Sequence, residues 1–219
     1  MNLQVFIDSF WKILLPGLVV TIPLTVISFS LAMIIAIITA LIQFAQVKVL
    51  KEIARFYIWF IRGTPLLVQL FVVFYGLPSI GITIDAIPAA IIVFSINEGA
   101  YCAETMRGAL ESIPKGQLEA GYCVGMSYIQ IIWRIVLPQA LRVAFPSLFN
   151  SLISLVKDTS LASNITVTEM MMETRMINAK VYEALTLYLE VAFIYLMFST
   201  VLTYIQGWCE KKISTYEKH

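Results

Sequence analysis

Five long apolar runs constrain the fold of this chain more than any other feature of its sequence. A helix needs about 20 consecutive, mostly apolar residues to cross roughly 30 Å of hydrocarbon, and each run reaches that length. We therefore expect an all-α integral membrane protein with one membrane domain over residues 1–219. Its five transmembrane helices are predicted near residues 15–43, 53–77, 86–106, 135–156 and 185–208.

The composition excludes a soluble globular protein and a nucleic-acid-binding protein. Hydrophobic residues make up 59% of the 219 residues and charged residues 13%, whereas an average soluble domain has roughly 45–50% and 25%. Fifteen Lys and Arg residues stand against 14 Asp and Glu residues, so the chain lacks the basic excess that nucleic-acid binding requires. The cysteines Cys102, Cys123 and Cys209 are expected to stay free thiols, because their predicted segments are membrane-embedded or cytoplasmic.

The basic residues gather in three segments outside the apolar runs. The linker 48–55, the segment 107–134 and the tail from Lys211 together hold nine of the 15 basic residues, whereas the linker PSIGITIDA holds none. The excess of positive charge predicts that these three segments are cytoplasmic, which places the N-terminus outside and the C-terminus in the cytoplasm. Three basic residues of the outer fourth linker fit this topology poorly: Lys157, Arg175 and Lys180.

The sequence offers little for enzymatic chemistry. Its one histidine is the terminal His219, and it contains no G-x-x-x-x-G-K-[ST] phosphate loop. We therefore expect no enzymatic activity, no metal site and no cofactor on this chain. If ATP drives its function, another subunit must bind and hydrolyse that ATP.

A polar segment, LEAGYCVGMSYIQIIWRIVLP, interrupts the apolar pattern between the third and fourth predicted helices. Ser112 is expected to cap a short helix that Pro114 starts and that ends where Gly125 relaxes the backbone. Ser127 and Gln130 have the spacing of a capping box, which predicts that a new helix begins there. The pattern alone leaves open whether this surface helix rests passively on the membrane or docks to a partner.

The same segment resembles the EAA loop of ABC importer permeases. The motif E-A-G-x-x-x-G, followed by I-x-L-P, matches this loop, with Gly121 where the family usually has a second alanine. The stretches RGTPLLVQLF, YGLP, AYCAETMRGALESIPKGQ, LPQALR and LVKDTSLA resemble the polar amino-acid branch of these permeases. Together they cover most of the chain from Phe56 onward.

The resemblance implies a type I ABC importer permease core of five helices with a cytoplasmic coupling helix, in a loop at about residues 108–138. It also implies a prokaryotic inner-membrane location and these partners: a second permease copy or homologue, two ATPase subunits that hold ATP and Mg, an external solute-binding protein, an amino-acid substrate and membrane lipid. The residues implied to couple the chain to the ATPase are Lys115, Glu119, Ala120, Gly121, Gly125 and Pro138.

Polar residues inside the predicted helices are candidates for the substrate pathway, because each is costly in hydrocarbon. Glu98 lies about 12 residues into the third helix, roughly 18 Å along it, near the bilayer midplane. It is either a pathway carboxylate or an acid that ties two permease halves together, and Tyr101 shares its face. Asn150 and Ser154 belong to a polar stripe on the fourth helix, for which close helix packing is the alternative.

The resemblance adds candidates from two motifs. In relatives of this branch the aspartate of KDTSL is a partner for the substrate ammonium, which implies that role for Asp158, with Thr159 and Ser160 beside it. Arg62 begins RGTP, which also contains Thr64, and its guanidinium could bind the substrate carboxylate or form a structural ion pair. Glu104 and Arg107 are predicted to form a simple ion pair on the helix surface.

The expected substrate is L-cystine, because the chain resembles permeases for cystine and related sulfur amino acids most closely. Permeases of this branch that carry arginine or lysine are expected to have an acid at the position of Trp59, three residues before RGTP. Glu98 keeps a basic substrate open, and arginine, glutamine or another polar amino acid are the alternatives.

An ATP-independent transporter or channel is disfavoured because five helices lack an inverted repeat and a self-contained pore. A membrane scaffold leaves the motifs unexplained.

Overall fold

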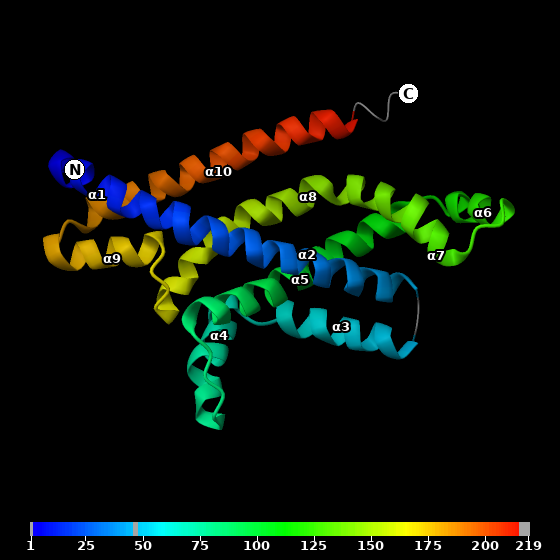
Figure 1. The fold of residues 1–219 in the computed structure, drawn as a ribbon, viewed down its shortest axis with the longest axis horizontal. Coiled ribbons are helices and arrows are strands. Elements are labelled where there is room, and N and C mark those ends of the chain that lie inside the picture. The colour runs from blue at the N-terminus through cyan, green and yellow to red at the C-terminus, as the bar shows by residue number, and fades with distance from the viewer. Residues whose placement is uncertain (1, 46–47, 215–219) are drawn as a thin grey trace. The chain divides into compact units, whose positions relative to one another are not determined.

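A computed structural model describes residues 2–45 and 48–214. Within these residues every regular element is helical, which confirms the predicted all-α class (Figure 1). The α-helices are α1 (Leu3–Pro16), α2 (Ile22–Phe44), α3 (Lys48–Arg62), α4 (Leu66–Phe71), α5 (Ala86–Ser112), α6 (Lys115–Cys123), α7 (Tyr128–Ile131), α8 (Leu137–Asp158), α9 (Met170–Val181) and α10 (Ala184–Ser214).

Within the part of the chain that the structure describes, four helical stretches are long and apolar enough to cross a membrane: Leu3–Phe44, Ala86–Ser112, Tyr128–Ile165 and Ala184–Ile213. A fifth crossing exists if the broken pair Lys48–Arg62 and Leu66–Ile80 is one span. The first stretch begins earlier than predicted, because α1 continues through Pro16 into the π-helical turn η1 (Gly17–Thr21) and then α2. The structure therefore supports four to five of the expected crossings, and the second predicted helix is the one in two pieces.

The break in the second predicted helix lies at the RGTP motif. A proline disfavours helical geometry at the residue before it. The helix α3 therefore ends at Arg62, and α4 begins after Pro65. A side chain at Gly63 would place its Cβ 2.8 Å from the backbone oxygen of Trp59. The glycine therefore lets the chain leave α3 directly after its last turn.

The chain divides into two compact units built from interleaved stretches. The first unit holds Met1–Ser30, Thr64–Ser95 and Leu152–Ile205, and the second holds Leu31–Gly63, Ile96–Ser151 and Gln206–His219. The expectation of one domain over residues 1–219 stays a prediction.

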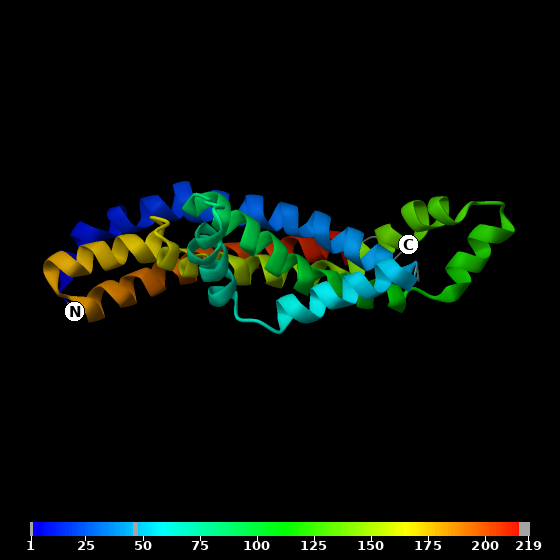
Figure 2. The same cartoon turned by 90° about the horizontal axis from the view of Figure 1, so that it is seen from below.

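In the first unit, α9 lies beside α1, as both views show (Figures 1 and 2). Apolar side chains from α1, α9 and α10 form a buried cluster that includes Ile13, Met170 and Ile194. A Cβ at Gly17 would lie 2.6 Å from the sulfur of Met170. The absence of a side chain at this glycine therefore lets the helix approach the start of α9 closely.

In the second unit, a polar contact joins α3 to α5. The hydroxyl of Tyr57 donates a hydrogen bond to the backbone oxygen of Ile96 at 2.6 Å. A Cβ at Gly99 would lie 2.9 Å from Ile35 and 3.1 Å from the Tyr57 hydroxyl, so the glycine permits this approach. The short helices α6 and α7 belong to the same unit and lie side by side as a hairpin (Figures 1 and 2).

Candidate functional site

The start of the α6–α7 hairpin differs from the prediction by a few residues. Ser112 does not cap α6, because α5 continues through it and its hydroxyl donates to the backbone oxygen of Ala109 at 2.8 Å. Pro114 has extended geometry and is itself the residue before the first helical position, Lys115. Local spacing placed the helix correctly but did not show that the preceding helix runs to position 112.

Gly125 ends α6 in a Schellman motif. Its φ is +80°, a value that favours glycine. The N–H of Gly125 donates to the backbone oxygen of Tyr122 at 2.9 Å, and the N–H of Met126 donates to the backbone oxygen of Gly121 at 3.0 Å. These two bonds satisfy the last carbonyls of the helix, so the predicted helix end at Gly125 is confirmed.

The next helix begins with the predicted capping box. The N–H of Gln130 donates to Ser127 Oγ at 3.4 Å, and the N–H of Ser127 donates to Gln130 Oε1 at 2.9 Å. The short helix α7 then continues through the π-helical turn η4 (Ile132–Val136) into α8. The turn between Gly125 and Ser127 therefore has defined geometry on both sides.

Gly121 is the buried contact point of the hairpin. A Cβ at this position would lie 2.7 Å from Cγ1 and 2.9 Å from Cδ1 of Ile131, which is itself fully buried. In this chain the isoleucine side chain fills the space that an alanine methyl group at position 121 would occupy. The glycine in the motif is therefore matched to Ile131.

The outer surface of the hairpin combines charged and apolar side chains. Lys115, Glu119 and Ala120 are exposed, as is Pro138 near the start of α8. Tyr122, Val124 and Ile129 are exposed by 52%, 76% and 68%. We call these last three residues the hairpin patch. Exposed apolar groups of this kind, beside charges, are typical of a surface that binds another protein.

In the second unit, the structure brings two of the predicted pathway residues into contact. The guanidinium carbon of Arg62 lies 5.2 Å from the centroid of the Tyr101 ring, which is within the range of a cation–π interaction. Glu98 is 7% exposed and accepts a hydrogen bond from the Cys102 thiol at 3.5 Å. Tyr101 is 42% exposed, so it does not share the buried surroundings of Glu98.

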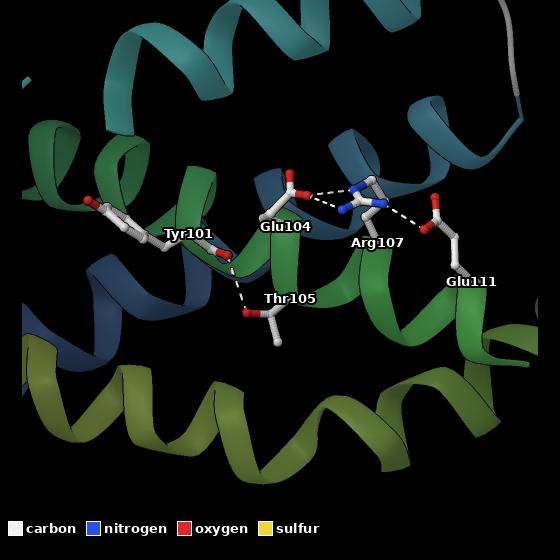
Figure 3. A network of polar contacts seen from close by, with 5 residues as sticks. All are labelled: Tyr101, Glu104, Thr105, Arg107 and Glu111. Carbon is white, nitrogen blue, oxygen red and sulfur yellow. Dashed lines mark hydrogen bonds and ion pairs between the residues drawn. The ribbon is translucent and has the colours of Figure 1, made fainter. Parts of the chain in front are cut away.

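A charged cluster lies further along α5, as Figure 3 shows. Arg107 donates to both Glu104 and Glu111, so the predicted Glu104–Arg107 pair is confirmed and extended by one turn. Thr105 Oγ1 donates to the backbone oxygen of Tyr101 at 3.4 Å. A pocket of about 350 Å³ in this unit is lined by all three charged residues of the cluster and by Trp59, whose side chain is 70% exposed. Asn150 of α8 is also exposed.

The remaining predicted pathway residues belong to the first unit. Ser154 is exposed and Asp158 half-buried, one turn apart at the end of α8. The hydroxyl of Thr159 is buried and donates to the oxygen of Val156 at 2.7 Å, so it is engaged with the backbone. The backbone oxygen of Ser160 accepts a hydrogen bond from Ser163 Oγ at 2.6 Å. The hydroxyl of Thr64 accepts a hydrogen bond from the Gln69 amide at 2.8 Å.

Asn164 joins three segments of the first unit, directly after the KDTSL motif. Its backbone oxygen accepts a hydrogen bond from the Tyr75 hydroxyl at 2.9 Å. Its side-chain oxygen accepts one from Arg175 of α9 at 3.3 Å, and its amide donates to the oxygen of Leu161 at 3.0 Å. The segment that carries Asp158 is therefore tied both to the Tyr75 region and to α9.

Two buried acids were missed by the sequence analysis. Glu190 is fully buried in α10, where one carboxylate oxygen accepts a hydrogen bond from Ser9 at 2.6 Å. Glu169 is fully buried at the start of α9 and accepts hydrogen bonds from two backbone N–H groups of that helix and from the Tyr195 hydroxyl. Glu190 lies inside a predicted membrane helix, so the reasoning applied to Glu98 would have found it. Glu169 lies in a linker and gives no such signal.

Comparison with known proteins shows where this fold and these motifs occur. Residues 32–215 match the family described as the binding-protein-dependent transport system inner membrane component. The chain is 46% identical over 210 residues to the L-cystine transport system permease protein TcyB of Bacillus subtilis (strain 168), covering 95% of this chain and 90% of the relative. It is 37% identical to the probable amino-acid ABC transporter permease protein YckA of the same organism, covering 98% and 95%.

Solved structures give the same result at the level of the fold. A crystal structure of an amino acid ABC transporter with histidines contains a chain with a TM-score of 0.86 and 28% identity, covering 94% of this chain and 96% of that one. An inward-facing MetNI methionine ABC transporter has a TM-score of 0.72 at 17% identity, covering 96% of both chains. The latter similarity concerns the fold alone.

Proposed function

We propose, since this chain belongs to the family of binding-protein-dependent transport system inner membrane components, that the amino acid it transports is L-cystine. The chain is the permease subunit of an amino-acid ABC importer, a multi-pass protein of the inner membrane with a transport role rather than an enzymatic one. The observation that carries the substrate proposal is the similarity to an L-cystine permease over nearly the whole chain.

Trp59 supports a substrate whose side chain carries no net positive charge. It stands where permeases for arginine or lysine are expected to have an acid, and its side chain is largely exposed. An indole offers a stacking surface and one N–H donor but no negative charge. Cystine has a polarizable disulfide and a second ammonium–carboxylate pair of zero net charge, so it is compatible with this position.

The partners we propose follow from the type of importer. A second permease copy or homologue completes the pathway, two ATPase subunits bind ATP and Mg, and an external solute-binding protein delivers the amino acid. The α6–α7 hairpin docks on the ATPase through Lys115, Glu119 and Ala120, with the hairpin patch as its apolar part. This assignment places the hairpin and the C-terminus in the cytoplasm and the N-terminus outside.

The substrate contacts we propose follow from charge. An amino acid presents a carboxylate and an ammonium group, and charge-assisted hydrogen bonds to these groups are the strong ones. We assign the ammonium to Asp158 and the carboxylate to Arg62, whose guanidinium carbon lies 5.2 Å from the centroid of the Tyr101 ring. Thr64, Tyr101, Asn150, Ser154, Thr159 and Ser160 are proposed as further pathway residues.

The test is competition for uptake of labelled L-cystine in cells that have this system as their only route. We expect excess unlabelled cystine to block uptake and excess arginine or glutamine to leave it largely unchanged. The Trp59→Phe variant is the matched control, because the phenylalanine ring keeps an uncharged aromatic surface for stacking at this position. The substrate proposal is lost if arginine or glutamine blocks uptake while unlabelled cystine does not.

A basic amino acid is the second candidate, and Glu98 is the observation that favours it. This acid is 7% exposed and could face the distal cation of arginine. Glu98→Gln separates the two candidates, because it removes the charge at constant size. If cystine is the substrate, the variant keeps its preference; if arginine is the substrate, the variant loses arginine uptake.

A further inference from the structure

A second pocket of the second unit lies between α8 and α10 and has no part in the assignments above. Its volume is about 340 Å³. It is lined by six residues: Arg142, Phe145, Trp208, Cys209, Lys212 and Ile213. The lining is thus mostly apolar, and both of its charged residues are cations.

One of the two cations lies over an aromatic ring of the pocket lining. Lys212 Nζ lies 5.2 Å from the centroid of the Trp208 ring, a cation–π contact that holds the ammonium beside the pocket. The nearby acid Glu210 does not line the pocket, and its carboxylate accepts a hydrogen bond from the Gln206 amide at 2.9 Å. The pocket therefore presents a net positive charge to a ligand.

The depth of the pocket in the membrane follows from the length of α10. The apolar stretch Ala184–Ile213 has 30 residues, about 45 Å at 1.5 Å per residue, whereas the hydrocarbon core is about 30 Å thick. Its last turns therefore reach the level of the lipid headgroups, where tryptophan and lysine side chains are typical. A bond from the Gln206 amide to the oxygen of Pro146 at 3.2 Å holds α8 beside α10 near this level.

We propose that this pocket binds one anionic phospholipid, with the lipid phosphate between Arg142 and Lys212 and an acyl chain along Phe145 and Ile213. Basic pockets between transmembrane helices are known to bind anionic headgroups. The charge selects the phosphate, and the apolar lining at the hydrocarbon boundary selects a lipid over a free ion. This site is independent of the transported amino acid.

The experiment measures quenching of Trp208 fluorescence by lipid. The full chain, with any subunits that copurify, is placed in phosphatidylcholine nanodiscs after Trp11, Trp59 and Trp133 are replaced by Phe. Brominated phosphatidylglycerol at low mole fraction should quench Trp208 more strongly than brominated phosphatidylcholine at the same fraction. One basic residue contributes about 1 kcal/mol to such binding, or about fivefold. Arg142→Gln and Lys212→Gln should each weaken the preference by that factor, and the double variant by about 25-fold.

Three controls make the result decisive. Lys212→Arg keeps the charge and should keep the preference, which separates lipid binding from misfolding. Lys211→Gln removes an adjacent charge that does not line the pocket, and it should change the preference by less than about twofold. Equal quenching by the two lipids would overturn the proposal. So would an equal loss in Lys211→Gln, abolition of the preference by free inorganic phosphate, or quenching that appears only after the copurifying subunits are removed.

Discussion

Gly121 of α6 and Ile131 of α7 meet so closely that a methyl group at position 121 would lie 2.7 Å from the isoleucine side chain. The two residues are ten positions apart and come together only because the chain reverses at Gly125. The glycine at this position of the motif therefore leaves room for the Ile131 side chain. The contact gives a direct prediction about compensating changes.

Gly121→Ala should destabilise the hairpin by about 1–3 kcal/mol, because the added methyl group overpacks a filled space. In an Ile131→Ala background the same change should be neutral or stabilising, because the methyl group then enters a cavity. The measurement is a double-mutant cycle on the thermal unfolding of the purified chain. Additive effects of the two substitutions would contradict the contact.

Gly125→Val should weaken association with the ATPase subunits and lower uptake while the chain stays in the membrane. A β-branched residue with φ near +80° is strained, at a cost of about 1–3 kcal/mol. The Schellman bonds of α6 would then be lost. Gly116→Val is the control, because a Cβ added at Gly116 would meet nothing within 4 Å and the φ of this glycine is not positive. Copurification of the ATPase and transport assays measure the effect, and equal behaviour of the two variants would argue against it.

Glu119→Lys should abolish uptake without loss of the chain from the membrane. The substitution reverses an exposed charge on the proposed docking surface, and like charges across an interface cost several kcal/mol, or more than about tenfold in affinity. Glu52→Lys, an exposed acid of α3 outside the hairpin, is the matched control. Normal ATPase association in Glu119→Lys would rule out the docking role of this residue.

Asp158→Asn should weaken substrate-stimulated ATPase activity more than assembly. The loss of a charge-assisted hydrogen bond to an ammonium costs about 1.5–3 kcal/mol, or roughly 10- to 150-fold in affinity. The assay is the dependence of ATPase activity on the concentration of substrate-loaded binding protein in the reconstituted complex. An unchanged concentration dependence would assign Asp158 a structural role. A loss of assembly in Asp158→Asn would also contradict the prediction, because the effect would then not be specific to substrate binding.

Glu169 predicts a pH dependence of stability. Burial raises the pKa of this carboxyl group, against the lowering effect of its hydrogen bonds from Met171, Tyr195 and Met172. The native state therefore holds this proton more tightly than the unfolded chain does. The stabilisation is complete below the unfolded pKa near 4.5 and is lost as the pH rises through the higher folded value. Glu169→Gln should make the unfolding temperature less dependent on pH above the unfolded value of 4.5; an identical slope in both proteins would contradict the effect.

The sequence predicts the local features of this protein better than its contacts. Gly125, and the capping box of Ser127 and Gln130, were predictable because each depends on residues within one turn of helix. The end of α5 at Ser112 was placed wrongly, because competition between two helices for the same residues is not visible in local spacing. The end of α3 before Pro65 was not predicted, because a single helix was expected over residues 53–77.

Contacts between distant residues needed the structure. The match of Gly121 to Ile131 depends on a chain reversal, and the bond between Ser9 and Glu190 joins residues 181 positions apart. Composition and spacing describe a helix by itself and not its neighbours. The roles of Arg62 and Asp158 in substrate binding stay predictions for the same reason.

The three hydrogen bonds at Asn164 have a consequence for how motion passes through the first unit. A loop that ends in free backbone adds independent degrees of freedom, so a displacement at one end fades before it reaches the other. Here Tyr75 and Arg175 both bond to Asn164, which lies in the 3-10 helix Thr159–Ile165 directly after Asp158. A displacement of α9 is therefore expected to reach the segment behind Asp158 through a single residue.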